Sequence, residues 1–387
     1  MMPETHSLYS EGLDEDKGFS VYLPADYHNP DYEPRHYPVI YVLDGEHYGG
    51  LLSTVSQSMA QSGNMPETIV VAVHAGESRL RDYTPGVSHT DWRGEPSDEF
   101  EQSGGGDAFL AFVEQALLPH IDGHYRSLNH RTLMGFSLGG LIGLHSFMTQ
   151  PALFQAYLII DASLWWDEQQ LVTRLAEMVD GESLSATMLT GRLYCSIADH
   201  EAEGPNQHSA MIEGNQGYMH HLKQLATARD CNHLSVTVET FTDETHNSVL
   251  VPSVCHGLRA LFEGHRFRYG WAKNIEAVAA HFSCYSAELG VDYIAPEKQL
   301  SVLTWYAGKI MGESARLAFM QYHCERYPKS PMAWAQLGAA YESQGDHDQA
   351  RVCYNNALSF NRNNIQARKG LQSVVAIQNT EKQHGCG

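Results

Sequence analysis

Short runs of apolar residues alternate with amphipathic stretches from the start of the chain to about residue 270. The runs have the length of buried strands and cover residues 37–43, 68–73, 132–135, 156–160, 193–197 and 234–240. Between two of them, residues 107–120 place apolar side chains at helical spacing, so we expect a helix that packs on a sheet. Strands that alternate with helices predict a mostly parallel sheet covered on both faces, an α/β fold.

Beyond residue 270 the pattern changes to successive amphipathic helices with few β-branched runs. Large and small residues then follow the 34-residue spacing of a tetratricopeptide repeat over residues 331–364, at Trp334, Leu337, Gly338, Tyr341, Ala350, Tyr354 and Ala357. Residues 299–327 are expected to form a degenerate helical hairpin before this repeat, and 365–377 a capping helix after it. A plain helical hairpin is the alternative at 331–364.

The two patterns predict two domains, residues 1–270 and 271–387, which agrees with a chain of 387 residues. Helical repeats commonly bind peptides or proteins, and a short array can also brace a neighbouring domain or form a dimer contact. A protein partner or self-association through the helical region is therefore an expectation, and so is a purely bracing role.

Charge and hydropathy narrow the partners and the compartment. Acidic residues outnumber basic ones by 46 to 25, and a formal charge of −21 repels nucleic acid and anionic membranes. The sequence contains no apolar run of about 18 residues and no basic, apolar start typical of a signal peptide. We therefore expect a cytoplasmic protein that binds neither nucleic acid nor membranes.

The cysteines and histidines predict no metal site. The seven cysteines are odd in number and lack C-x-x-C spacing, and the 22 histidines include no H-E-x-x-H motif. We expect reduced thiols, no metal ion and no organic cofactor.

The segment Arg131–Gly140 carries the strongest chemical signal. It contains Gly135-Phe136-Ser137-Leu138-Gly139, a G-x-S-x-G motif that follows an apolar strand and opens a helix-like run. This context is typical of the nucleophile elbow of an α/β-hydrolase, where glycines let strand and helix approach closely and the serine sits exposed on a sharp turn. Ser137 is therefore the predicted nucleophile, and the fold predicted for residues 1–270 is an α/β-hydrolase.

A serine hydroxyl needs a histidine that accepts its proton and a carboxylate that orients the histidine. In this fold both follow the nucleophile, with the acid before the histidine. His246 lies just after the last predicted strand and is the predicted base.

The acid is open among three residues of the loop after strand 193–197, namely Asp199, Glu201 and Glu203. If Ala198 stands where such strands usually place a glycine, the carboxylate three residues on is Glu201, which we prefer over Asp199.

The oxyanion formed during acyl transfer needs two backbone N–H donors. Leu138, the residue after the nucleophile, supplies one. The strand that ends at Leu43-Asp44-Gly45 precedes the second, so the amide of Glu46 is the predicted donor, while Asp44 can be a simple turn former. We also expect the long Gly-rich loop 86–106 to lie beside the active site.

Six segments in order resemble the esterase D or putative-esterase branch of the α/β-hydrolases, which includes siderophore esterases, feruloyl esterases and mycolyltransferases. They begin at Leu43, Arg79, Gly104, Gly135, Ala162 and Glu244, and the likeness covers about residues 18–265. The resemblance implies a Ser137 nucleophile, a His246 base, an oxyanion hole of the Glu46 and Leu138 amides, and Trp165 and Trp166 near the substrate. The family varies at the acid, and some siderophore esterases work with a Ser-His pair.

The predicted function is that of a serine esterase, which hydrolyses a small-molecule carboxylic ester through an acyl-enzyme on Ser137. Two alternatives stay open: an acyltransferase that passes the same acyl group to an alcohol, and a catalytically inactive hydrolase-like scaffold that binds partners.

Overall fold

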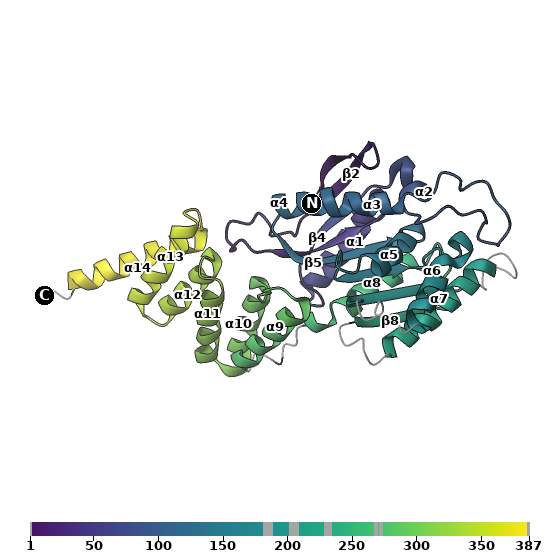
Figure 1. The fold of residues 1–387 in the computed structure, drawn as a ribbon. Helices are drawn as coiled ribbons and strands as arrows, with labels where there is room; N and C mark the ends of the chain where they lie inside the picture. The colour runs from purple at the N-terminus through teal and green to yellow at the C-terminus, as the bar shows by residue number, and fades with distance from the viewer. Residues whose placement is uncertain are drawn as a thin grey trace. The chain divides into compact units, whose positions relative to one another are not determined.

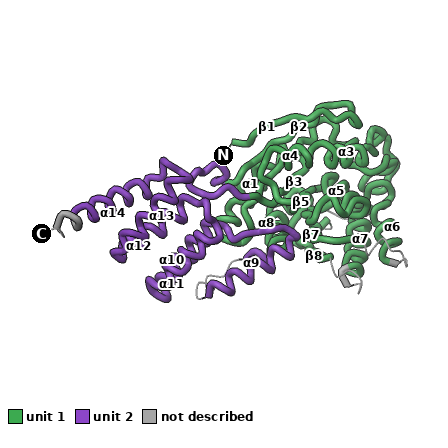
Figure 2. The backbone as a smooth tube through the Cα atoms, turned by 60° about the vertical axis from the view of Figure 1, so that its left-hand side comes forward, with its two compact units in different colours: residues 1–24, 36–263 green, residues 25–35, 264–387 purple. Residues whose placement is uncertain are grey.

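The computed structural model describes residues 2–180, 189–200, 209–227, 234–266, 270 and 274–384. The chain forms two compact units, which Figure 2 distinguishes by colour. Unit 1 comprises residues 1–24 and 36–263, and unit 2 comprises residues 25–35 and 264–387. The sequence predicts a division at residue 270, and nothing in its pattern assigns residues 25–35 to the helical part.

Unit 1 is built around an eight-stranded sheet in the order β1-β2-β4-β3-β5-β6-β7-β8 (Figure 1). Its strands are β1 Glu4–Ser10, β2 Glu15–Tyr22, β3 Tyr37–Val42, β4 Ile69–Val73, β5 Ser127–Phe136, β6 Ala156–Ile160, β7 Gly191–Ala198 and β8 Leu234–Phe241. β1 pairs antiparallel with β2, and β2 antiparallel with β4, while β4, β3, β5, β6, β7 and β8 run parallel. The predicted mostly parallel sheet is confirmed.

Most of the predicted strands form where apolar runs can be buried on both faces, whereas β8, at the edge of the sheet, has no buried residue. β3, β4 and β6 are buried at every position, as expected for central parallel strands under helices. β1 and β2 are absent from the prediction because most of β1 is exposed or half-buried and its residues alternate with polar ones, so no apolar run marks it.

Alternate residues of each strand face opposite helical layers. On one face, Met134, Leu158 and Ile160 join the core formed with α1 (Gly45–Gln61) and α8 (Leu250–Leu261). On the other, Leu133 and Ile159 lie so close to Gly143 of α5 (Leu138–Thr149) that a Cβ there would contact both side chains. Helices on both faces leave the strand ends as the accessible place for chemistry.

The remaining helices of unit 1 connect and cover the sheet. They are η1 Gly76–Ser78, α2 Arg79–Asp82, α3 Gly106–Phe112, η2 Val113–Leu117, α4 Leu118–His124, α6 Trp166–Asp180, α7 Ser209–Thr227 and the short η5 Glu263–His265 at the border of the unit. The helix predicted for residues 107–120 is present as α3, the π-helical η2 and α4 in continuous succession.

Unit 2 is helical. Its helices are α9 Ile275–Leu289, α10 Glu297–Met311, α11 Glu313–Arg326, α12 Pro331–Ser343, α13 His347–Phe360 and α14 Ile365–His384. α12 begins with a Ser330 cap and a proline in its first turn, and α13 begins with an Asp346 cap, so each start is set by local sequence. Ala335 and Ala357 pack with the large Tyr354 in one buried cluster, the alternation of small and large residues that the repeat pattern predicts.

Residues 25–35 belong to the helical unit through polar contacts. The Nδ2 groups of Asn361 and Asn364 both donate to Asp31 Oδ1 at 2.8 Å, and the Met332 amide donates to the Asp31 carbonyl at 2.9 Å. The Glu33 amide also donates to Glu297 Oε1 at 2.7 Å. These partners lie about 300 residues away in sequence, so pattern analysis could not find them.

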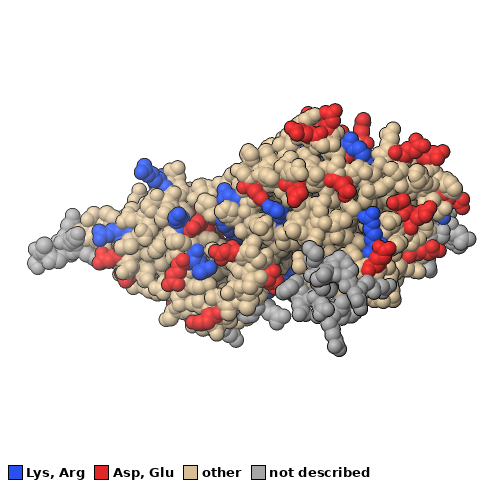
Figure 3. Space-filling view, viewed as in Figure 1, with Lys and Arg blue, Asp and Glu red and all other residues tan. Residues whose placement is uncertain are grey.

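Asp and Glu side chains are spread over the visible surface of unit 1, in agreement with the formal charge of −21 (Figure 3). Within the described residues, no helix is both long enough and apolar enough to cross a membrane.

Candidate active site

Ser137 occupies a strained turn between β5 and α5. Its backbone has φ 57° and ψ −120°, a conformation that costs a non-glycine residue on the order of 1–3 kcal/mol. The turn is held from both sides, because the Ser137 amide donates to the Ile160 carbonyl and the Ser137 carbonyl accepts from the Ser163 amide, each at 3.1 Å. The Ser137 Oγ lies 3.2 Å from Ser163 Oγ.

Gly135 permits this turn. A Cβ at position 135 would lie 2.0 Å from the Gly139 carbonyl oxygen, a distance that no side chain can occupy. Strand and helix therefore approach through a position that must be glycine, as the G-x-S-x-G pattern predicts.

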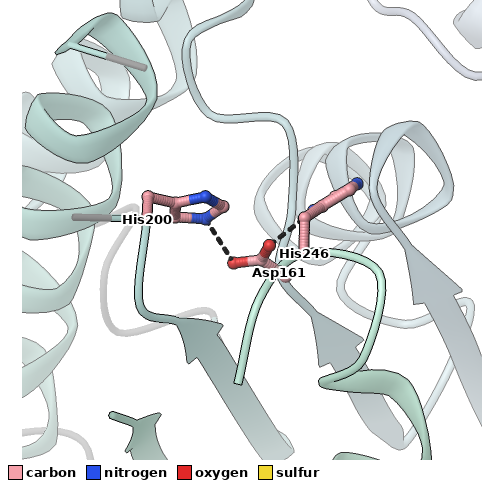
Figure 4. Close-up of side chains that lie close together, drawn as sticks. All are labelled: Asp161, His200 and His246. Carbon is pink, nitrogen blue, oxygen red and sulfur yellow. Dashed lines mark hydrogen bonds and ion pairs between the residues drawn. The ribbon is translucent and has the colours of Figure 1, made fainter. Parts of the chain in front are cut away.

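His246 follows β8 and reaches the same edge of the sheet. Its ring stacks on Phe136, the residue before the nucleophile, with centroids 4.7 Å apart and planes at 26°. His246 Nδ1 lies 2.5 Å from Asp161 Oδ2 (Figure 4). Because an ionised carboxylate can only accept, Nδ1 carries the hydrogen of this bond, and Nε2 of the neutral ring then has the lone pair.

Asp161 follows β6 directly and is the carboxylate that contacts the His246 ring. It is fully buried and has φ 41°. Burial alone would raise the pKa of its carboxyl, but the hydrogen bonds from His200 and His246 outweigh that effect and lower the pKa to about 2. Asp161 is therefore ionised throughout the neutral range.

The sequence placed the acid one strand later, in the loop after β7. Glu201 and Glu203 lie outside the described residues. The backbone amide of Asp199 donates to the Glu244 carbonyl at 2.8 Å, and a catalytic role for its carboxylate stays a prediction. The available signal for Asp161 is its place between an apolar strand and Ala162, where one of the segments used for the family resemblance begins.

The loop after β7 instead brings His200 to Asp161. His200 Nε2 lies 3.0 Å from Asp161 Oδ1, and the Ala198 amide donates to the same oxygen at 3.0 Å. Asp161, His200 and His246 are residue types that can bind metal ions, and among the described residues they form the one cluster in which three such side chains bring their ligand atoms within 4.8 Å of one another. These atoms already serve as hydrogen-bond partners for one another.

The predicted oxyanion donors both lie in first turns of helices, where amides have no partner within the helix. Leu138 begins α5, and Glu46 is the second residue of α1. The Glu46 carboxylate accepts hydrogen bonds from the amides of Ala75 and Gly76. Burial would raise the pKa of this carboxyl, but the amides of Gly76, Glu46 itself and Ala75 lower it. The Glu46 amide thus already interacts with the Glu46 carboxylate. Its role as an oxyanion donor stays a prediction.

Asp44 does more than form a turn. It adopts a left-handed conformation with φ 53° before α1, and its buried carboxylate forms a two-bond ion pair with Arg79, at 2.6 and 2.9 Å. A Cβ at Gly139 would lie 3.5 Å from Asp44 Oδ2, so the pair lies beside the elbow. About a third of the Arg79 side chain is exposed, and its guanidinium is paired with Asp44.

Trp165 and Trp166 follow the Asp161–Ser163 segment but are largely buried, at 6% and 2% exposure. Both pack against Phe100 of the long loop, and Trp165 also contacts Trp92. Trp166 Nε1 donates to the Gly86 carbonyl at 2.8 Å. The tryptophans therefore anchor loop 86–106 next to the Ser163 turn, and their contact with a substrate stays a prediction.

A pocket of about 510 Å³ lies where the ends of β7 and β8 meet α7. Its wall includes His200, together with Ala198 and Thr240 from the strands and Asn215 and Lys223 from the helix.

The strand order, the crossing helices and the strained Ser137 turn define an α/β-hydrolase. Residues 10–247 match the family described as "Putative esterase", which is more than half of the chain. The chain belongs to this family. Residues 331–364 match a tetratricopeptide repeat, which confirms that part of the prediction.

Similar proteins include siderophore esterases. The chain is 27% identical over 192 residues to the ferri-bacillibactin esterase BesA of Bacillus subtilis, an alignment that covers 46% of the chain and 65% of that relative. It is 25% identical over 251 residues to the siderophore enterobactin esterase of Emericella nidulans, covering 57% and 81%. The match to the first relative thus spans slightly less than two thirds of its length.

The solved structure of an IroE-like serine hydrolase from Shewanella oneidensis is also similar. It superimposes with a TM-score of 0.71 at 26% identity and covers 84% of this chain and 99% of that one.

Proposed function

We propose that the protein is a serine esterase in which Ser137 is the nucleophile, His246 the general base and Asp161 the residue that orients and stabilises the base. The observation that carries this proposal is the Asp161–His246 hydrogen bond of 2.5 Å, with the His246 ring stacked on the residue before a strained, elbow-bound serine. Family membership of residues 10–247 supports the reaction class.

The geometry supports a two-step reaction. The Ser137 oxygen attacks the ester carbonyl while His246 Nε2 accepts its proton, and the negative charge of Asp161 stabilises the resulting imidazolium. The tetrahedral oxyanion is stabilised by backbone amides, of which Leu138 is one and Glu46 the predicted other. His246 then gives its proton to the leaving alcohol, which leaves an acyl-enzyme, and a water activated by the same ring releases the acid.

We further propose a siderophore ester as the substrate class. This step rests on the similar proteins, which are a ferri-bacillibactin esterase and a siderophore enterobactin esterase.

The esterase proposal is tested with Ser137→Ala on a short p-nitrophenyl ester. Loss of the nucleophile costs roughly 10⁶ in kcat in a comparable site, so hydrolysis should fall to background. The matched control is Ser146→Ala in α5, a serine whose hydroxyl contacts Tyr157 and which should keep the wild-type rate. An unchanged rate in Ser137→Ala would contradict the esterase and favour a binding scaffold.

The substrate class is tested separately, by chromatography of ferric and iron-free siderophore esters after incubation with the enzyme. Ser137-dependent cleavage of one of them supports the proposal. Hydrolysis of the p-nitrophenyl ester with no cleavage of any siderophore ester would contradict the substrate class but leave the esterase standing. A competing alcohol in the same assay distinguishes hydrolysis from acyl transfer by its product.

A further inference from the structure

Asp161 contacts two histidines that come from different strands. Its Oδ2 faces His246 at 2.5 Å, and its Oδ1 faces His200 at 3.0 Å, as Figure 4 shows. His246 follows β8 and His200 follows β7, so the ends of three neighbouring strands meet at this one carboxylate. His200 is as buried as Asp161 itself, with 2% of its side chain exposed.

The two oxygens of Asp161 have different partners and so different tasks. Oδ1 accepts from the Ala198 amide and from His200, whereas Oδ2 accepts from His246. The terminal torsion of an aspartate is broad and roughly two-fold, so nothing within the side chain fixes the plane of its carboxylate. Two donors on Oδ1 fix that plane and thereby the direction in which Oδ2 accepts.

We propose that His200 is a positioning residue for the triad: its Nε2–H holds the Asp161 carboxylate in the plane that keeps His246 in the Nδ1–H form. The inference rests on the proposed function, since it assigns His200 a task in the reaction of Ser137.

The chemistry of an imidazole suits this task. A neutral imidazole donates one hydrogen bond through Nε2 without adding a full charge. A lysine or arginine in the same place would offset the negative charge of Asp161 and weaken its stabilisation of the imidazolium on His246. The titratable side chains that line the same pocket as His200 include those of Asp199, His220 and Lys223.

The test compares His200→Gln with His200→Asn. Glutamine places its amide near the position of Nε2 and still donates to Oδ1, whereas asparagine places the same group near the position of Nδ1 and falls short. A hydrogen bond to a charged group is worth about 1.5–3 kcal/mol, or roughly a 10- to 100-fold change in rate. We expect the Asn variant to lose that factor in kcat with an unchanged KM, and the Gln variant to stay within about threefold of wild type by the same reasoning.

A matched control is available in unit 2. His323 is buried and its Nε2 lies 3.3 Å from the buried Glu297 carboxylate, so it makes the same kind of contact. His323→Asn should leave kcat unchanged. Active-site titration of the serine in every variant corrects kcat for any misfolded fraction.

A second readout does not depend on turnover. The short Asp161–His246 bond should give a far-downfield proton resonance for His246 Nδ1–H, present in the wild type and in His200→Gln and lost or broadened in His200→Asn. His200→Leu, which fills the ring volume without donating, should behave like the Asn variant.

Equal kcat values and equal resonances in the Gln and Asn variants would overturn the positioning role, while Ser137-dependent hydrolysis would still stand. If the wild type lacks Ser137-dependent hydrolysis, the proposed function fails instead. In that case the His246 Nδ1–H resonance, compared between wild type, His200→Gln and His200→Asn, tests the positioning of Asp161 without any need for turnover. A variant set that lost stability but kept its kcat per titrated serine would likewise contradict the inference.

Discussion

The two units of the protein differ in where their backbones are strained. Among the described residues, every non-glycine position with positive φ lies in unit 1, at Asp14, Asp44, Ser137, Asp161, Asp167, Glu168 and Gln169. In unit 2 the described positions with positive φ are glycines, Gly290, Gly312 and Gly345, which adopt this conformation without steric cost.

The strained positions of unit 1 include three that lie within two residues of the ends of parallel strands. Asp44 comes after β3, Ser137 after β5 and Asp161 after β6. Strain of this kind persists only where surrounding contacts impose it, and it clusters at functional sites. In unit 1, backbone strain that lowers stability holds side chains of the candidate site in place. In unit 2, by contrast, α12 and α13 begin at capping residues that the local sequence supplies.

The largest expected effect comes from Asp161→Asn. The amide oxygen of asparagine would replace Oδ1 and satisfy the Ala198 and His200 donors, which turns its NH2 group toward His246 Nδ1. His246 would then have to accept through Nδ1 and carry its hydrogen on Nε2, so it could not act as a base. We expect kcat to fall about 10⁴-fold with little change in fold, as measured by steady-state kinetics and circular dichroism.

A control for this variant is Glu239→Gln, which breaks a similar pair, His256 Nδ1 with Glu239 Oε1 at 2.8 Å, at a half-exposed place. Its kcat should match the wild type. A kcat for Asp161→Asn within tenfold of the wild type would remove Asp161 from the mechanism.

Gly135→Ala should destabilise unit 1, because the turn at Ser137 leaves no room for a Cβ at the end of β5. The new Cβ would lie 2.0 Å from a backbone oxygen that cannot move without the helix, so we expect a loss of more than about 4 kcal/mol in the free energy of unfolding. The readout is the midpoint of guanidinium unfolding. Gly123→Ala in α4, where nothing lies within 4 Å, should be neutral or slightly stabilising.

Acid should weaken unit 1 through Asp161. Its pKa is about 2 in the folded state against 3.8 for a free carboxyl, so its ionised form favours folding. That contribution, about 2 kcal/mol, is nearly complete at about pH 5 and is lost as the pH falls toward 2. The unfolding free energy of the wild type relative to Asp161→Asn should therefore decrease by this amount between pH 5 and pH 2. A constant difference would mean that Asp161 is not held as the ion.

The smallest effect is expected in unit 2, from Gly290→Ala at the end of α9. Its φ of 66° disfavours a Cβ although the space around it is open, so the cost is about 1 kcal/mol, with no change in kcat. Thermal unfolding and the ester assay measure the two quantities. A fall in kcat for Gly290→Ala would show that the helical unit affects catalysis, which would contradict the contrast drawn between the two units.

Much of the fold could be predicted because its signals are local. The strands β3 to β8 coincide with the predicted runs, and the elbow joins three local signals, a strand, two glycines and a helix, within ten residues. β1 and β2 were not predicted because polar residues interrupt the apolar ones in both, and residues 25–35 were not assigned because their partners are distant in sequence.

The site was predictable only in part. Ser137 and His246 are marked by motif and order, but Asp161 looks in sequence like any aspartate that ends a strand. Which carboxylate meets the histidine depends on how neighbouring strand ends converge, and β6 and β7 both end at this edge. His200 was missed for the same reason, because its contact with Asp161 belongs to no motif of its own.

The assignment of residues 25–35 to the helical unit makes that unit discontinuous along the chain. A truncation after residue 263 would leave Asp31 and Glu33 without the groups they contact in the helices. A fragment expressed from residue 264 would lack the Asp31 oxygen that accepts from both Asn361 and Asn364. Dissecting the protein into independent pieces would therefore require a permuted gene that carries residues 25–35 along with the helices.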